Sequence, residues 1–136
     1  MIEIDKEIEL KTNTETEQLL FVTRYLVYVN FTFDLTVVSD GFSGISHFCA
    51  RRDQLEKMCF ELTKMHLKLS GKTKLEDNDS DAYVEFEMES NGKLNVVGQV
   101  GGTHEEHFLK FKFQTDQTCI PHFVKDFELL LKYQYK

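Results

Sequence analysis

An acidic segment stands out among the residues that could bind a ligand. Between Glu76 and Glu89 every charged residue is acidic. Its part Asp77-Asn78-Asp79-Ser80-Asp81 starts like an EF-hand calcium loop, which also requires Gly at position 6 and Glu at position 12. Counted from Asp77, these positions hold Ala82 and Met88. The segment is therefore interpreted as a solvated turn, with loose cation binding as the alternative.

A second candidate for metal binding is His104-Glu105-Glu106-His107, which is similar to the zincin motif. That motif places two histidines four residues apart on one helix face. Here the spacing is three residues, and the segment follows Gly101-Gly102 instead of lying in a helix. Two histidines without a third ligand nearby make a weak zinc site. We expect no metal ligands and no cofactor.

Three cysteines could supply a nucleophile, but Cys49, Cys59 and Cys119 are far apart and lie among apolar residues. Burial raises the pKa of a thiol and suppresses its reactivity. An odd number of separated cysteines is typical of a reduced, cytoplasmic protein. The glycine-rich residues 98–102 lie between two predicted strands, whereas a phosphate-binding loop lies between a strand and a helix. We expect no catalytic residues and no enzyme activity.

Length and net charge further limit the classes of function and partner that this chain could have. The 136 residues suit a single domain spanning 1–136. The net charge of -7 argues against nucleic acid and anionic membrane as partners, and it favours a basic protein. The sequence has no apolar run of about 20 residues that could span a membrane, and its start does not read as a signal peptide. A cytoplasmic location is expected.

Alternation of apolar and polar residues predicts strands over 2–11, 25–37, 42–50, 83–89, 94–100 and 107–113. The run 25–37 is the longest, and we expect it to be one central strand. Asn91-Gly92 predicts a tight hairpin. Apolar residues at i, i+3 and i+4 predict amphipathic helices over 52–69 and from about 118 to the C-terminal region. Residues 72–81 are expected to be a charged loop.

These elements predict an α+β fold with two layers. Its simplest form is one antiparallel sheet with both amphipathic helices packed on one face, which leaves the other face open. Tyrosines and carboxylates on that face could bind a basic protein, since aromatic residues anchor and charges steer. An ordinary solvated face is the alternative. The predicted partner-binding residues are Tyr28, Asp34, Asp77, Asp79, Asp81, Tyr83, Glu85, Glu87 and Glu89.

The order of elements carries a family resemblance over about residues 20–133. An aromatic-rich alternating run leads into Asp40-Gly41-Phe42-Ser43-Gly44, and a helix of the form L-x-x-(M/C)-x-x-x-L closes on Ser70-Gly71. A hairpin over Asn91-Gly92 precedes a Phe-rich strand and a final helix, HFVKDFELLLK. This layout resembles the WapI family of bacterial immunity proteins, which are partners of polymorphic or contact-dependent toxins.

The resemblance implies a non-catalytic, cytoplasmic protein. It would bind the C-terminal toxin domain of a cognate effector and occlude the active or substrate-binding surface. Such toxins are often nucleases with a basic surface, which a chain of charge -7 would suit. The alternative is a protein-interaction module or structural subunit of unrelated purpose. The oligomeric state is left open.

Overall fold

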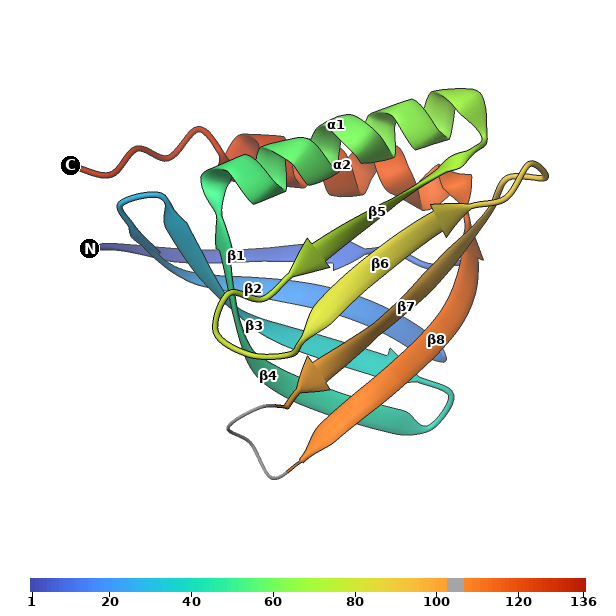
Figure 1. The fold of residues 1–136 in the computed structure, drawn as a ribbon, viewed down its shortest axis with the longest axis horizontal. Coiled ribbons are helices and arrows are strands. Elements are labelled where there is room, and N and C mark those ends of the chain that lie inside the picture. The colour runs from blue at the N-terminus through green and yellow to red at the C-terminus, as the bar shows by residue number, and fades with distance from the viewer. Residues whose placement is uncertain (103–106) are drawn as a thin grey trace.

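The structure is a computed structural model that describes residues 1–102 and 107–136. The chain forms strands, a helix, more strands and a second helix (Figure 1). The first strands are β1 (Ile2–Leu10), β2 (Glu17–Val27), β3 (Asn30–Ser39) and β4 (Phe42–Arg51), followed by α1 (Arg52–Lys68). The second set is β5 (Gly71–Glu76), β6 (Tyr83–Met88), β7 (Lys93–Gly101) and β8 (Phe108–Asp116). A short 3-10 turn (Gln117–Cys119) leads into α2 (Ile120–Leu130).

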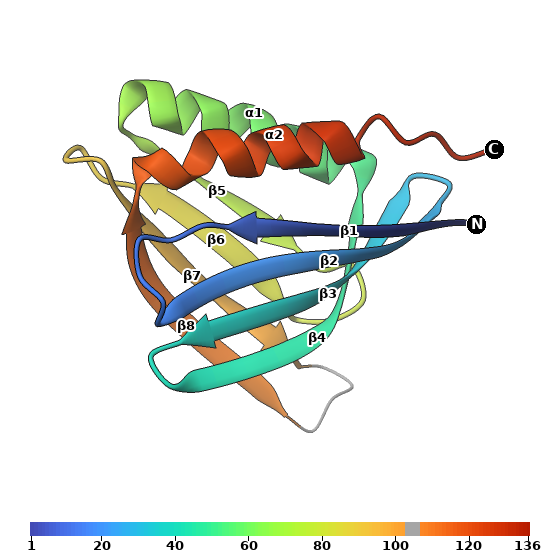
Figure 2. The same cartoon turned by 180° about the vertical axis from the view of Figure 1, so that it is seen from behind.

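The strands form two antiparallel sheets, which confirms the α+β class. Sheet A has the order β1-β2-β3-β4 and sheet B the order β5-β6-β7-β8. Sheet B faces the viewer in Figure 1, and sheet A faces the viewer in Figure 2. The expectation of a single sheet with one open face is wrong. The buried faces of the two sheets pack against each other around a shared core, so each sheet exposes its own outer face.

The run 25–37 is two strands and not one. Val27 pairs with Asn30 across a two-residue turn at Tyr28 and Val29, and Tyr28 takes a positive φ of 56°. The register of β2 with β3 shifts by one residue between Thr23 and Tyr25, which is the signature of a β-bulge. The bulge and the turn together preserve the apparent period of two, so the sequence alternates straight through a chain reversal.

The loop predicted over 72–81 is also partly wrong, because β5 occupies Gly71–Glu76. Only Thr73 and Leu75 of this strand are buried, and the exposed Lys72 and Lys74 alternate with them. A strand with a single buried apolar residue shows no alternation of apolar and polar residues from which it could be predicted. The strand is held by its pairing with β6, from Gly71 opposite Met88 to Glu76 opposite Tyr83.

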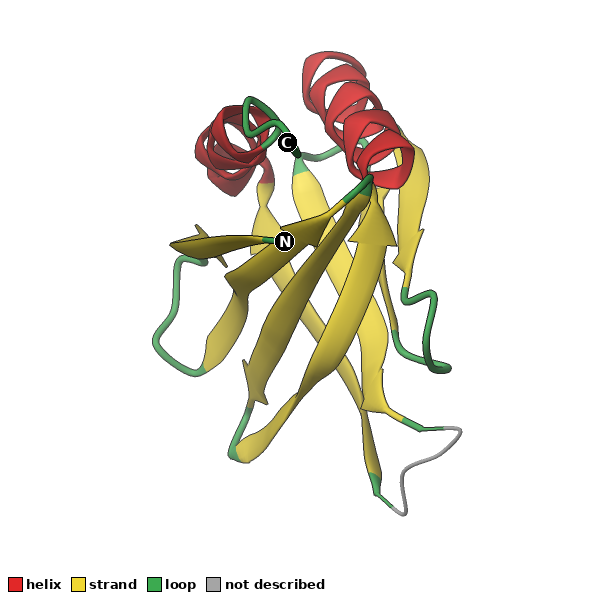
Figure 3. Cartoon of the chain, turned by 90° about the vertical axis from the view of Figure 1, so that its left-hand side faces the viewer, coloured by secondary structure: helices red, strands yellow, loops and turns green. Residues whose placement is uncertain are grey.

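The sheets come closest where β4 passes β7 and β8. A Cβ on Gly44 would lie 2.8 Å from Val100 Cγ2, and the Gly101 N–H donates to Ser46 Oγ over 3.1 Å. On the opposite side the helices lie next to each other above the sheets, with α2 against β1 and α1 against β5 (Figure 3). They close the space between the sheets there.

The core joins both sheets and both helices. Phe123 of α2 has its ring 6.2 Å from that of Phe21 in sheet A and 5.9 Å from that of Phe86 in sheet B, centroid to centroid. Helix α1 buries one apolar stripe, as predicted from its spacing: Leu55, Met58, Cys59, Leu62 and Met65. The two helices thus belong to one continuous core with both sheets. The outer faces of the sheets do not contribute to this core.

Candidate functional site

The predicted partner-binding residues do not share one face of the molecule, because the strands divide between two sheets. Tyr28 lies in the turn between β2 and β3, where its ring packs 4.8 Å from that of Tyr135. Asp34 lies on the outer face of sheet A. The remaining residues belong to the sheet B half: Asp77, Asp79 and Asp81 in the loop between β5 and β6, and Tyr83, Glu85, Glu87 and Glu89 along or just after β6.

Asp77 is buried, and its carboxylate is occupied within the protein. It accepts hydrogen bonds from the N–H of Cys49 at 2.8 Å, from the N–H of Asp79 at 3.1 Å and from the Ser80 hydroxyl. The Asp77 N–H donates to the carbonyl of Ala82 over 2.9 Å and closes the loop. These bonds assign Asp77 a structural role. Asp79 and Asp81 are exposed and free to meet another molecule.

His47 brings two of the candidates, Asp34 and Asp79, into one neighbourhood. Asp34 lies opposite His47 in the pairing of β3 with β4, and His47 Nε2 lies 3.7 Å from Asp79 Oδ2. Asp34 also forms an ion pair of 2.7 Å with Arg24, which neutralises its charge. The loop of sheet B therefore meets the outer face of sheet A at His47.

The outer face of sheet B is not acidic overall, although the sequence around β6 is. Lys74 of β5 lies opposite Glu85, and Lys72 lies opposite Glu87. Lys72 Nζ forms a 3.3 Å ion pair with Glu85, and Lys74 Nζ lies 4.5 Å from the centre of the Tyr83 ring. Pairing across strands brings in lysines that the acidic segment itself lacks.

The other end of this face has a network around Glu89. Its Oε2 accepts hydrogen bonds from Asn95 Nδ2 at 3.1 Å and from Gln114 Nε2 at 2.9 Å. The exposed Lys112 of β8 lies near this network, whereas Lys110, opposite Gln99, lies toward the Tyr83 end of the face. The charged groups that the strand pairing places on this face, with Glu89 included, are balanced in sign: Lys72, Lys74, Lys93, Lys110 and Lys112 against Glu76, Glu85, Glu87, Glu89 and Asp116.

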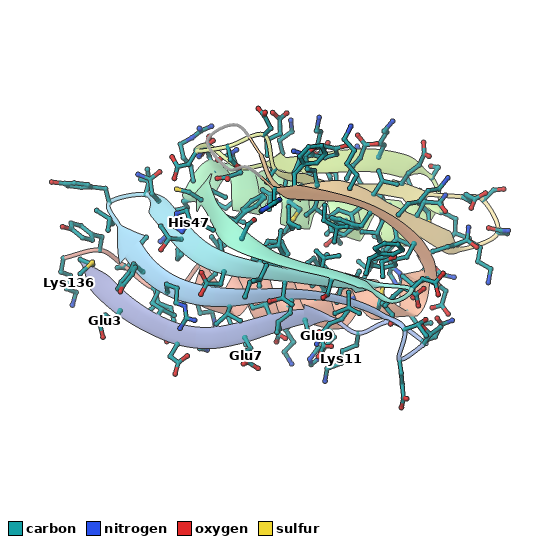
Figure 4. The ribbon with its side chains drawn as sticks, turned by 90° about the horizontal axis from the view of Figure 1, so that it is seen from below. Glu3, Glu7, Glu9, Lys11, His47 and Lys136 are labelled. Carbon is teal, nitrogen blue, oxygen red and sulfur yellow. The ribbon has the colours of Figure 1, made fainter. Side chains whose placement is uncertain are left out.

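The acidic surface lies instead on sheet A, where the sequence reasoning proposed only Asp34. Glu3, Asp5, Glu7 and Glu9 follow the outer side of β1, while the buried residues Ile4 and Ile8 point into the core. Figure 4 shows Glu3, Glu7 and Glu9 along β1, with Lys11 just beyond the strand and His47 elsewhere on the sheet. The alternation that predicts a strand over 2–11 places Ile4 and Ile8 on one side of it and these acidic residues on the other.

The cysteines are buried and free, as expected for reduced core residues. Burial raises the pKa of the Cys49 thiol to about 11 and those of Cys59 and Cys119 to about 12. These thiols stay protonated and unreactive at neutral pH.

Within residues 1–102 and 107–136, no three His, Cys, Asp or Glu side chains are grouped so that they could hold a metal ion. His104, Glu105 and Glu106 of the zincin-like segment lie outside the described residues. None of the helices in the same ranges is long and apolar enough to cross a membrane.

Comparison with known proteins identifies the family. The family model described as the immunity protein WapI-like family matches residues 29–134, in agreement with the resemblance seen over 20–133. No curated protein and no solved structure gives a significant match. The matched range starts in the turn before β3 and continues past α2, so it covers most of the chain and leaves β1 and β2 outside. The chain belongs to the WapI-like family of immunity proteins.

Proposed function

We propose that this protein binds the toxin domain of a cognate effector and neutralises it by covering its active or substrate-binding surface. The observation that carries this proposal is the family match over residues 29–134. Neutralisation of this kind needs no catalytic group on the immunity protein. It needs a stable surface that is complementary to the toxin.

The architecture supports a role in binding. Its two sheets and two helices share one core, so the strands that carry the outer faces are held from behind by packed aromatic side chains. A preformed surface loses little conformational entropy when a partner docks, which favours tight association. A typical interface takes about 800 Å² from each partner, which is roughly a tenth of the 7644 Å² that this chain exposes.

The charge supports a basic partner. A net charge of -7 accelerates encounter with a positively charged domain and disfavours direct binding to nucleic acid. A toxin that acts on nucleic acid must carry a basic surface for its own substrate. An acidic protein seated on that surface would exclude the substrate by occupation and by charge. The encounter would take place in the cytoplasm.

Co-expression with a toxin domain tests the proposal. The domain to use is the predicted C-terminal domain of any large secreted protein that is encoded just upstream of this chain. We expect the two proteins to co-purify and the toxin activity in the complex to be lost. A basic toxin domain from an unrelated system serves as the control for attraction by charge alone, and it should not be neutralised. A cognate domain that stays free, or stays active when bound, would overturn the proposal.

A further inference from the structure

We propose that the outer face of sheet A is the surface that docks the toxin domain, and that it selects a domain with a basic surface. This inference rests on the proposed function and adds the location and chemistry of the interface. The sheet A face is defined by its outward residues: Glu3, Asp5, Glu7 and Glu9 on β1, Leu20 and Val22 on β2, Thr32, Asp34, Thr36 and Val38 on β3, and Ile45 and His47 on β4.

Its edge carries a row of carboxylates on β1. Lys6, in the same strand, does not neutralise the row, because its Nζ lies 5.8 Å from the centre of the Tyr133 ring, beside the C-terminal tail. Arg24 lies in the bulge of β2, and its ion pair with Asp34 at 2.7 Å holds it on this face. The row of four acidic side chains therefore keeps its negative charge.

Apolar side chains also lie on this face, among the polar residues that are usual on the solvent side of an antiparallel sheet. Glu7 lies opposite Val22, and Glu9 lies opposite Leu20. Further across the sheet, Thr36 separates Leu20 from Ile45, whose side chain is 67% exposed. Apolar side chains bordered by charged ones are common in protein–protein interfaces.

Among the described residues, neither helix covers this face. In Figure 2 the strands of sheet A lie open toward the viewer, and both helices run along the β1 side of the molecule. Helix α2 packs on β1 and α1 packs mainly on β5, both from the core side. The helices therefore leave the apolar residues of the sheet A face uncovered.

The balance of charges distinguishes the sheet A face from the other candidate docking surfaces. The sheet B face balances its glutamates with lysines, as described above. The groove between α1 and α2 is lined by charges of both signs, from Arg52, Glu56, Glu128 and Lys132. Among these described surfaces, the sheet A face is the one that combines apolar side chains with an excess of acidic groups. A basic protein surface is the occupant that fits it.

Residues 29–134 match the family model, so the carboxylate row of β1 and both apolar residues of β2 lie outside the matched range. An immunity protein must distinguish its own toxin from others, which requires a surface that fits one partner and not the rest.

A matched pair of charge-reversal variants tests the location. Glu3→Lys/Glu7→Lys changes the sheet A face, and Glu85→Lys/Glu87→Lys changes the sheet B face. Each variant moves the net charge from -7 to -3, since two negative charges become two positive ones. Binding to the purified cognate toxin domain is measured at low and high salt, and urea unfolding shows whether each variant is folded.

We expect the sheet A variant to weaken binding about tenfold or more at low salt, mainly through a slower association rate. The sheet B variant should stay within about threefold of the wild type, the residual effect expected from net charge alone. Ile45→Ser should weaken binding as well, through faster dissociation and with little dependence on salt.

The outcomes separate the two proposals. If the wild type binds and both double variants lose affinity equally, or only the sheet B variant loses it, the sheet A interface is overturned while the immunity function stands. If the wild type does not bind its cognate domain at all, the proposed function fails and the interface fails with it.

Discussion

The backbone N–H of Cys49 donates a 2.8 Å hydrogen bond to the carboxylate of Asp77, and this bond links β4 of sheet A to the loop that leads into β6 of sheet B. A second bond runs beside it, from the N–H of Asn78 to the carbonyl of Cys49 over 3.0 Å. The acidic loop is therefore part of the junction between the sheets. Its buried member, Asp77, links the two sheets, and its exposed member Asp79 lies 3.7 Å from His47 on the sheet A face.

Asp77→Ala should destabilise the protein by about 1–3 kcal/mol, because it leaves the buried N–H of Cys49 without an acceptor. The measurement is the free energy of unfolding in urea. Asp81→Ala is the control, since it removes the same carboxylate from an exposed position in the same loop. Equal stabilities for the two variants would contradict the structural role of Asp77.

Phe123→Ala should cost about 3–5 kcal/mol, the range for truncating a large buried side chain. Phe123 is fully buried and contacts aromatic rings of both sheets, so its loss leaves a cavity that neither sheet alone can close. Phe60→Ala on the outer side of α1 is the control, because Phe60 is 66% exposed. A similar effect for both variants would show that α2 does not fill the space between the sheets.

The buried thiols should make stability fall at alkaline pH. Burial raises the pKa of Cys59 from its ordinary value of 9.0 to about 12. Below pH 9 the thiol is protonated in both states and its contribution is fully present. As the pH rises from about 9 to 12, only the unfolded chain releases the proton, so unfolding becomes easier.

Cys59→Ala tests this contribution by urea unfolding between pH 8 and pH 10. Its stability should decline less steeply than that of the wild type, by up to about 1.4 kcal/mol per pH unit. The constant cost of the lost side chain is removed by comparing slopes rather than absolute values. Parallel curves for the two proteins would show that the Cys59 thiol ionises as readily in the folded state as in the unfolded one.

The elements with strong local signals were predicted correctly from the sequence. Both amphipathic helices and the hairpin at Asn91-Gly92 appear where expected, because helical spacing and turn chemistry act within a few residues. The errors concern signals that are not local. Because of the bulge between Thr23 and Tyr25, the alternation of apolar residues continues unbroken through a chain reversal, and the sequence therefore predicted one strand there. Strand β5 has too few apolar residues to be predicted from alternation.

The candidate site depended even more on contacts between distant segments. The acidic segment around Glu85 and Glu87 looked uncompensated in the sequence, but Lys72 and Lys74 lie opposite these residues once β5 pairs with β6. On β1, by contrast, the strand pairing brings no lysine opposite the glutamates. It places apolar side chains of β2 beside Glu7 and Glu9. The pairing of strands determines which charged side chains become neighbours. The alternation within a single strand does not predict that pairing.

The most direct test of toxin neutralisation is a titration of the cognate toxin domain's activity with this protein. We expect activity to fall in proportion to the protein added and to vanish at about one equivalent, which is the signature of tight stoichiometric binding. The Glu3→Lys/Glu7→Lys variant should require a higher concentration for the same effect. Toxin activity that persists in the presence of excess wild-type protein would contradict the immunity mechanism.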